Sequence, residues 1–222
     1  MRFAPFVAIF AGLTLSQAVG AQSADREGMW ETSLGVVFEN STDVDFEGGT
    51  TADIESGTGF KLGFAYHYTD NLEFGANFGI DQADYTADLV AQTGQTIPVK
   101  GELEYTTLMF DGTWNFMSGP FTPFVTGGIG WSWVDTNVPT GLPQTGCWWD
   151  PWYGYICTTY QDTKTIDGFA YQLGAGLRYD LSDTFAVHGS YRVTWVDIDR
   201  ATSTPQFDGF QLSLGWKFRL AL

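Results

Sequence analysis

The sequence predicts an all-β chain that closes into an eight-stranded, antiparallel, up-and-down transmembrane β-barrel. Bulky apolar residues recur at every second position in eight segments, and the connections between these segments alternate between short and long. The clearest alternation is Phe60, Leu62, Phe64, Tyr66 and Tyr68, interleaved with Lys61, Gly63, Ala65 and His67. Such a period of two places the bulky row on one face of a strand and the small or polar row on the other. Lipid outside and a wet, packed lumen inside explain this division.

The predicted strands are residues 29–39, 58–69, 71–82, 103–116, 121–134, 167–180, 184–197 and 208–222. Each is long enough to cross hydrocarbon as a tilted strand, which takes about 9 to 11 residues. The connections at 69–71, 117–120 and 181–183 are tight, whereas those at 40–57, 83–102, 135–166 and 198–207 are long. Bacterial barrels have short periplasmic turns and long outer loops. The alternation therefore predicts a Gram-negative outer-membrane protein with both termini in the periplasm.

A soluble eight-stranded barrel of the lipocalin kind is the main alternative fold. It would place the apolar rows inside, where a lumen of eight strands has room for few side chains. One strand alone offers Phe169, Tyr171, Leu173, Leu177 and Tyr179. The opposite rows contain Gly174, Gly176, Arg178, Ser190 and Arg192, which would make a poor soluble exterior. The transmembrane barrel is therefore favoured.

The two ends of the chain carry export signals. Residues 1–21 have the charge at Arg2, the short apolar run and the small residues of a cleaved signal peptide, which leaves residues 22–222 as one barrel domain. The spacing Ser213-x-Gly215-x-x-Phe218-x-Leu220 resembles the C-terminal targeting pattern of outer-membrane barrels, although the chain ends in Leu222 rather than an aromatic residue. We expect the barrel assembly machinery, outer-membrane lipid and lipopolysaccharide as partners.

The net charge of −16 argues against nucleic acid as a partner, because binding to phosphates needs basic patches. Many of the acids fall in the long connections, for example Asp43, Asp45, Glu47, Asp53 and Glu55. We interpret them as solvated loop residues. A divalent-cation site is the alternative, but no spacing resembles an EF-hand loop. The sequence gives no reason to expect a cofactor or a metal.

The inward rows contain charged residues. By parity these are Lys61, Glu73, Asp81, Asp111, Arg178, Arg192 and Lys217, together with His67 and His188. Unpaired charges in a narrow lumen cost several kcal/mol, so opposite charges there should pair. The favoured interpretation is a hydrogen-bonded plug that stabilises the barrel. The alternative is a path for ions or solutes lined by the same groups.

The sequence His188-Gly189-Ser190 contains a histidine and a serine two positions apart. A His-x-Ser pair resembles the core of outer-membrane lipid A deacylases, in which histidine activates serine for acyl transfer. That chemistry requires access to lipid, whereas the parity of Val187 and Tyr191 turns His188 and Ser190 inward. The Asn-Ala that follows the serine in that motif is also replaced here, by Tyr191-Arg192. We therefore expect no enzymatic activity.

The third long connection contains Cys147 and Cys157, which are the only cysteines. A secreted chain makes a disulfide the default, and zinc lacks further ligands nearby. The aromatic residues between the cysteines are Trp148, Trp149, Trp152, Tyr153 and Tyr155. They could join the aromatic girdle at the membrane surface, cap the barrel mouth, or form an exposed surface for glycan, lipid or protein.

Three segments carry a family resemblance: Tyr68-Thr69-Asp70-Asn71-Leu72, residues 120–130 and Gly174-Ala175-Gly176-Leu177-Arg178-Tyr179. They lie within residues 58–82, 119–134 and 167–218, which resemble the small eight-stranded barrels of the OmpA, OmpW and opacity-protein group. We expect no peptidoglycan-binding domain after the barrel. We predict a non-enzymatic protein with a structural or surface-interaction role through its long loops, chiefly residues 135–166. The OmpW-like resemblance implies the alternative, a narrow channel for small or hydrophobic solutes.

Overall fold

The computed structural model describes residues 25–45, 51–90, 96–139, 144–160, 163–197 and 204–220. The signal peptide predicted for residues 1–21 lies outside these residues and stays a prediction. Among the described residues, no helix has the length and apolar character needed to cross a membrane.

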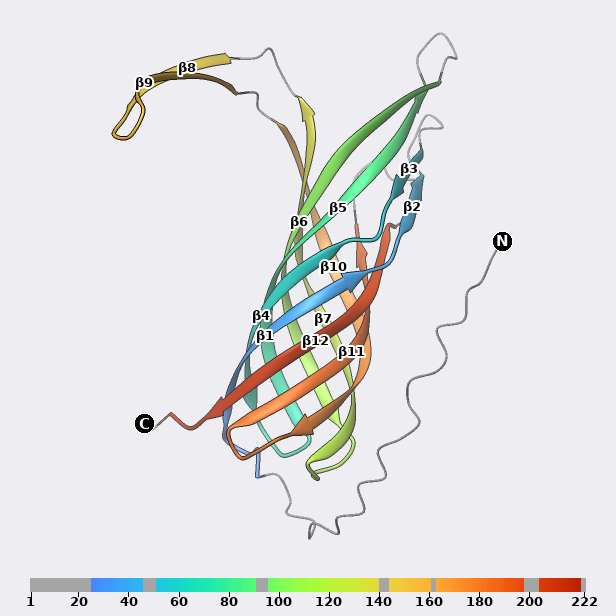
Figure 1. Ribbon diagram of the computed structural model, residues 1–222. Coiled ribbons are helices and arrows are strands. Elements are labelled where there is room, and N and C mark those ends of the chain that lie inside the picture. Colours follow the sequence, from blue (N-terminus) through green and yellow to red (C-terminus); the bar gives the residue numbers. More distant parts are fainter. Residues whose placement is uncertain are drawn as a thin grey trace, which may run out of the picture.

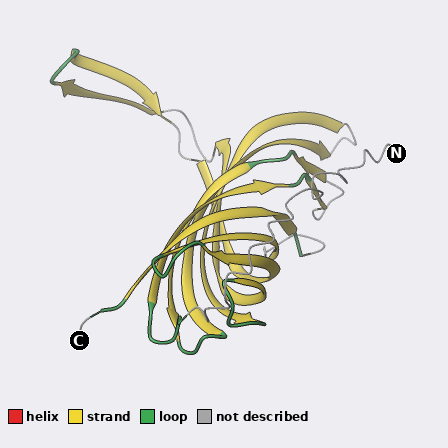
Figure 2. Cartoon of the chain, turned by 60° about the horizontal axis from the view of Figure 1, so that its bottom comes forward, coloured by secondary structure: helices red, strands yellow, loops and turns green. Residues whose placement is uncertain are grey.

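Eight strands form one closed antiparallel barrel (Figures 1 and 2). They are β1 (Trp30–Glu39), β4 (Thr58–His67), β5 (Leu72–Val90), β6 (Thr96–Asn115), β7 (Phe121–Pro139), β10 (Thr163–Asp180), β11 (Phe185–Val196) and β12 (Gln206–Phe218). Each strand pairs with the next of this series. Pairing of β12 with β1, from Trp30↔Phe218 to Glu39↔Gly209, closes the ring. The predicted fold class is confirmed.

The barrel has two different ends. The three tight turns, the start of β1 and the end of β12 lie together at what we name the turn end (Figure 1). The long connections lie at the opposite end, the loop end. Each tight turn is closed by short backbone hydrogen bonds; for example, the Leu181 N–H donates to the Phe185 carbonyl at 2.9 Å.

The strands extend further toward the loop end than the sequence predicts. Residues 83–90 and 96–102, expected in a loop, belong to β5 and β6, and β7 and β10 continue into the segment 135–166. The expectation failed because the chemistry of the two faces reverses along the strand. In β5, Tyr85 and Ala87 are buried inside, while Gln82 and Asp84 are exposed outside. The parity is unchanged, but the outward row faces water instead of lipid and is no longer apolar.

Two short hairpins accompany the barrel. Strands β2 (Thr42–Asp45) and β3 (Thr51–Ile54) pair with each other, and β3 pairs with the extended part of β5. Strands β8 (Gln144–Asp150) and β9 (Gly154–Tyr160) form a separate two-stranded sheet, the β8–β9 hairpin. Figure 1 shows this hairpin standing beyond the loop end and out to one side.

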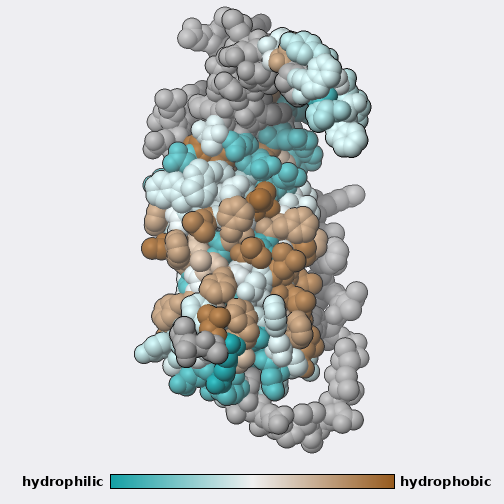
Figure 3. Space-filling model, turned by 90° about the vertical axis from the view of Figure 1, so that its left-hand side faces the viewer, coloured by the Kyte–Doolittle hydropathy of each residue, from teal (hydrophilic) through white to brown (hydrophobic). Residues whose placement is uncertain are grey.

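The outer wall carries an apolar belt, with exposed apolar side chains on all eight barrel strands; Figure 3 shows one face of it. Its exposed aliphatic residues include Leu34, Leu62, Ile80, Ile129, Leu173, Leu212 and Leu214. Aromatic side chains border the belt, with Phe121, Tyr179 and Trp216 toward the turn end and Trp131, Phe169 and Tyr171 toward the loop end. Figure 3 shows the brown belt between hydrophilic zones at both ends of the face in view. This arrangement is the outer surface of a barrel in lipid.

Candidate functional site

The turn-end half of the barrel interior contains two groups of ion pairs, which together we name the charge network. Its four acids and four bases are Glu31, Glu73, Asp111, Asp180, Arg26, Arg178, Arg192 and Lys217. Their equal numbers let each buried charge face an opposite charge. Such pairing is required because an isolated charge in a low-dielectric interior is costly.

Arg178 is the centre of this network and is 2% exposed. Its Nη2 lies 2.6 Å from Glu31 Oε2 and 3.2 Å from Asp180 Oδ1, and its Nη1 lies 3.5 Å from Glu73 Oε2. The planar guanidinium has five N–H donors in a fixed arrangement, so one side chain can serve acids from three strands. Arg178 therefore ties β1, β5 and β10 together across the lumen.

Asp180 links the network to the turn end. It accepts hydrogen bonds from Lys217 Nζ at 2.8 Å and from Arg26 Nη2 at 2.6 Å. Arg26 is fully buried although it precedes β1, and its guanidinium also donates to the backbone carbonyls of Asp70, Met117 and Gly119. These carbonyls belong to two of the tight turns. Through these contacts Arg26 holds the segment before β1 against the turn end of the barrel.

Asp111 and Arg192 form the second group of the charge network. Its carboxylate accepts hydrogen bonds from the side-chain amides of Asn77 and Gln172, and Arg192 Nη1 lies 3.8 Å away. Gly128 lies opposite Asp111 on β7, where a Cβ would collide with the carboxylate. Glycine at this position therefore makes room for the charge.

The space left inside this half is a cavity of about 50 Å³ beside Arg178, His188 and Arg192. It has room for a few water molecules. His188 Nε2 and Arg192 Nη1 face the carboxylates of Glu31 and Asp111, but among the described residues neither nitrogen makes a hydrogen bond, so water could complete their hydrogen bonding. A cavity of this size holds water but is too small for a larger solute.

The loop-end half of the interior is apolar, and we name it the apolar core. It consists of Val44, Ala52, Ile54, Tyr85, Ala87, Leu103, Tyr105, Met109, Val134, Ala170, Val196 and Phe207. The rings of Tyr105 and Phe207 lie 5.0 Å apart across the interior. Lys61 and Asp81, both buried, lie between this core and the charge network. The lumen is thus filled by charged groups in one half and by hydrocarbon in the other.

The structure turns all seven predicted lumen charges toward the interior. Glu73, Asp111, Arg178, Arg192 and Lys217 join the charge network, while Lys61 and Asp81 lie nearer the loop end. Sequence reasoning missed Glu31, Asp180 and Arg26. Parity could have identified both acids: Asp180 shares a strand face with Arg178, and Glu31 alternates with the outward row that includes Leu34 and Phe38. Nothing in the strand pattern marks Arg26, because it lies outside every strand.

The His188-Gly189-Ser190 segment faces the lumen. Ser190 Oγ lies 3.4 Å from Arg192 Nε. His188 Nε2 lies 3.3 Å from Glu31 Oε1, and His188 Nδ1 lies 3.5 Å from Ser213 Oγ. No hydrogen bond joins His188 to Ser190 in the part of the chain that the structure describes. His67 also points inward, with its Nε2 3.1 Å from Glu31 Oε2 and its Nδ1 3.6 Å from Glu73 Oε2. Within the described ranges, no three histidine, cysteine or acidic side chains converge on a metal site.

The β8–β9 hairpin is closed by the predicted disulfide. Cys147 and Cys157 are directly opposite in the pairing of β8 with β9, and the disulfide joins them. At the tip, Asp150 Oδ1 accepts hydrogen bonds from the backbone N–H groups of Trp152 at 2.8 Å and Tyr153 at 2.9 Å. Gly154 follows with φ +78°, a conformation that favours glycine. Asp150 before the turn and Gly154 after it therefore stabilise the conformation of the tip.

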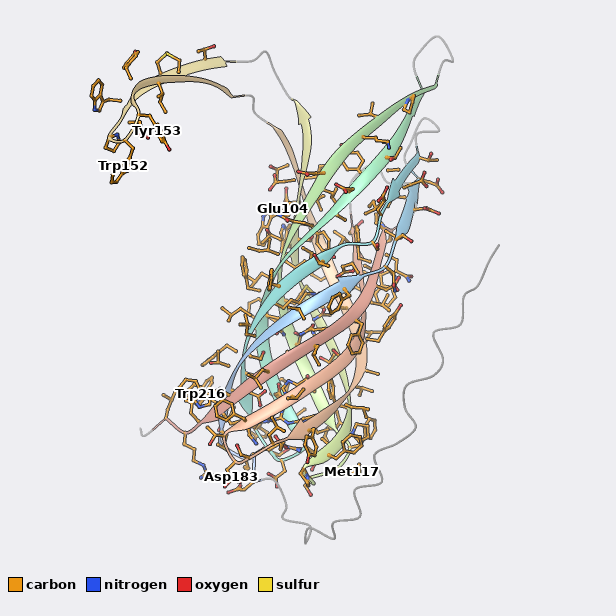
Figure 4. The ribbon with its side chains drawn as sticks, in the orientation of Figure 1. Glu104, Met117, Trp152, Tyr153, Asp183 and Trp216 are labelled. Atoms are coloured by element: carbon orange, nitrogen blue, oxygen red, sulfur yellow. A yellow bond between two sulfur atoms is a disulfide. The ribbon has the colours of Figure 1, made fainter. Side chains whose placement is uncertain are left out.

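This hairpin exposes its aromatic side chains. Trp149, Trp152, Tyr153 and Tyr155 are 73%, 88%, 82% and 68% exposed. Trp149 and Tyr155 are opposite one another, on the same face as the disulfide. Trp148 pairs with Ile156 in the backbone register. Figure 4 shows Trp152 and Tyr153 at the tip, far from the belt residue Trp216. In this structure the tip lies away from the aromatic residues that border the belt.

Residues 8–218 match the family described as the outer membrane protein beta-barrel domain. The chain belongs to this family. Its membership places the protein in the outer membrane of Gram-negative bacteria and confirms the resemblance to small eight-stranded barrels. No curated protein sequence matches the chain closely enough to serve as a relative.

Several solved structures are similar to this chain. Neisserial surface protein A is similar with a TM-score of 0.52 at 9% identity, over 86% of this chain and 98% of that one. OprG from Pseudomonas aeruginosa has a TM-score of 0.48 at 15% identity, over 88% and 98%. Ail of Yersinia pestis, in complex with the heparin analogue sucrose octasulfate, has a TM-score of 0.46 at 16% identity, over 86% and 99%. At these identities the likeness concerns the fold alone.

Proposed function

We propose that this protein is a non-enzymatic barrel whose closed wall presents the β8–β9 hairpin outside the cell as an interaction surface. The observation that carries the proposal is the exposure of Trp149, Trp152, Tyr153 and Tyr155 on a hairpin stapled by a disulfide. Exposed large aromatic side chains are unfavourable in water, and rigid ones are the usual anchors of protein interfaces. The orientation follows the rule that long connections of such barrels face outward.

The narrow OmpW-like channel is the competing proposal, and the charged lumen favours it. Against it stand the small cavity beside Arg178 and the apolar core that fills the loop-end half. A solute could pass only if both the charge network and the apolar core opened. We therefore expect the folded protein to be non-conducting.

Conductance in a planar bilayer tests the channel proposal. The disulfide-intact barrel is first shown to be folded by its heat-dependent mobility on a gel. We expect no stepped conductance from the wild-type protein. Discrete steps whose size changes in Arg192→Gln would overturn the closed-barrel proposal and establish the lumen as a path.

A binding panel tests the surface role. Vesicles that contain the barrel are applied to immobilised neutral and anionic oligosaccharides, basic and acidic proteins, and supported lipid bilayers. We expect retention on at least one class, reduced about tenfold or more when Trp149, Trp152 and Tyr155 are all changed to alanine, as for aromatic anchors at other interfaces. Equal retention of wild-type and variant vesicles across the whole panel contradicts the proposal.

A further inference from the structure

We infer that the β8–β9 hairpin binds a basic, arginine-bearing polypeptide surface, with the acidic outer wall of the loop end steering the approach. This inference rests on the proposed function and specifies the chemistry of its partner. Three features of the described residues support it: the open rings of the hairpin, the absence of positive charge there, and the position of the exposed acids.

The rings are available for a cation. Trp149 and Tyr155 are side by side on adjacent strands, and the rings of Trp149, Trp152, Tyr153 and Tyr155 stack on no other ring whose side chain the structure describes. Their faces carry the negative part of the aromatic quadrupole, which attracts guanidinium and ammonium groups. Arginine is the better partner because its planar group stacks on a ring and is weakly hydrated. The rings thus provide contacts for a cation.

The charge of the hairpin favours a positively charged partner. Residues 144–160 contain Asp150 and no lysine or arginine. Asp150 Oδ1 is occupied by two backbone N–H groups, and its second oxygen adds negative charge beside Trp152. A sulfated or phosphorylated ligand would find no base on this surface. A basic ligand would find rings and a carboxylate together.

The outer wall at the loop end carries the same sign. Asp84, Glu102, Glu104 and Asp135 line a groove of about 450 Å³ on the outside of β5, β6 and β7, and Asp167 is exposed on β10. Figure 4 shows Glu104 on this part of the wall, above the belt. With a net charge of −16, the protein attracts cations over a distance of about one Debye length. The acids therefore raise the encounter rate, while the rings hold the bound partner.

The test uses the full mature barrel, disulfide-intact, in nanodiscs of zwitterionic lipid. The probe is a fluorescent twelve-residue peptide of alternating arginine and glycine, and a glutamine-glycine peptide is the matched neutral probe. We expect Trp149→Ala with Trp152→Ala to weaken binding of the arginine peptide about tenfold, the effect of two exposed cation–π contacts. The matched control, Trp149→Phe with Trp152→Phe, keeps both rings and is expected to lose clearly less.

The acids and the rings are expected to act on different rates. Glu102→Gln with Glu104→Gln should slow association and reduce its salt dependence, whereas the alanine pair should speed dissociation. Equal binding of the arginine peptide by wild type and the alanine pair overturns the inference. If hairpin-dependent retention then persists on neutral oligosaccharides or lipid bilayers, the proposed surface role survives. If no class is retained through the hairpin, both the inference and the proposed function fail.

Discussion

The two halves of the barrel interior are filled by different chemistry on the same strands. In the turn-end half, Arg178 and its carboxylate partners cross the lumen, and lipid covers the outside. In the loop-end half, Phe207 and Tyr105 meet inside, and acids such as Glu104 face outward. The difference indicates that the medium outside decides which face of a strand is apolar. Where water replaces lipid, the hydrophobic effect acts on the interior, as in a soluble barrel.

The two halves should therefore respond differently to mutation. A charge removed from the turn-end half leaves buried partners without compensation, whereas a ring removed from the loop-end half leaves a cavity. We expect the two kinds of mutation to lower the free energy of unfolding by similar amounts, but second mutations can separate their causes.

The largest effect is expected for Arg178→Met. Glu31, Asp180 and Glu73 then lose a shared partner inside the barrel, which should lower the free energy of unfolding by about 3–5 kcal/mol. Urea unfolding of the barrel in lipid vesicles measures this loss. The double variant Arg178→Met with Glu31→Gln should lose less than the sum of the single variants. Strict additivity would show that the two side chains do not interact.

Phe207→Ala tests the apolar core. Phe207 is 6% exposed and packs on Tyr105, so its truncation should cost about 3–4 kcal/mol of unfolding free energy. The same urea experiment measures it. The variant should still conduct no current, because the charge network continues to fill the other half. Stepped conductance in Phe207→Ala alone would show that the apolar core is the only barrier.

Loss of the disulfide should act on the hairpin and not on the barrel. Replacing both Cys147 and Cys157 with serine removes about 2–3 kcal/mol of local stabilisation, because the bridge closes a short loop. Amide hydrogen exchange should accelerate in residues 144–160. The urea midpoint of the barrel should stay unchanged, since β8 and β9 pair only with each other. A shifted midpoint would indicate that the hairpin contributes to barrel stability.

The smallest effect is expected for Arg219→Ala. Its ion pair with Asp25, at 2.9 Å, is exposed on both sides, with side-chain accessibilities of 59% and 76%. Water and salt screen such pairs, so the unfolding free energy should change by less than about 1 kcal/mol. The contrast with Arg178→Met compares an exposed ion pair with a buried one. A loss comparable to that of Arg178→Met would mean that exposure does not decide the contribution of an ion pair here.

The sequence was sufficient for the lipid-facing half of the barrel. The alternation around Phe60 to Tyr68 and the alternating connections predict eight strands and closure, because lipid imposes a strict apolar row. The same rule predicts a loop at residues 83–102, which is wrong for residues 83–90 and 96–102, because there the apolar row faces the interior and the outward row is polar. The disulfide between Cys147 and Cys157 was predicted from the export signal and is present in the structure.

The candidate site was only partly predictable. Parity oriented Arg178 and Asp111, since both belong to strands with clear outward rows. It could not show that Glu31 and Glu73 meet Arg178, because these acids belong to β1 and β5, far from β10 in the chain, and reach Arg178 only through the tilt and register of the barrel. Arg26 was missed for a different reason, because residues outside strands have no parity.

The contacts of Arg26 also constrain the order of assembly. Although it stands near the beginning of the chain, its partners are the carbonyls of Asp70, Met117 and Gly119 and the carboxylate of Asp180, which lies 154 residues away. These groups come from the turns after β4 and β6 and from the end of β10. Arg26 can therefore make all of these contacts only after those parts of the barrel have come together, so its docking follows the pairing of their strands.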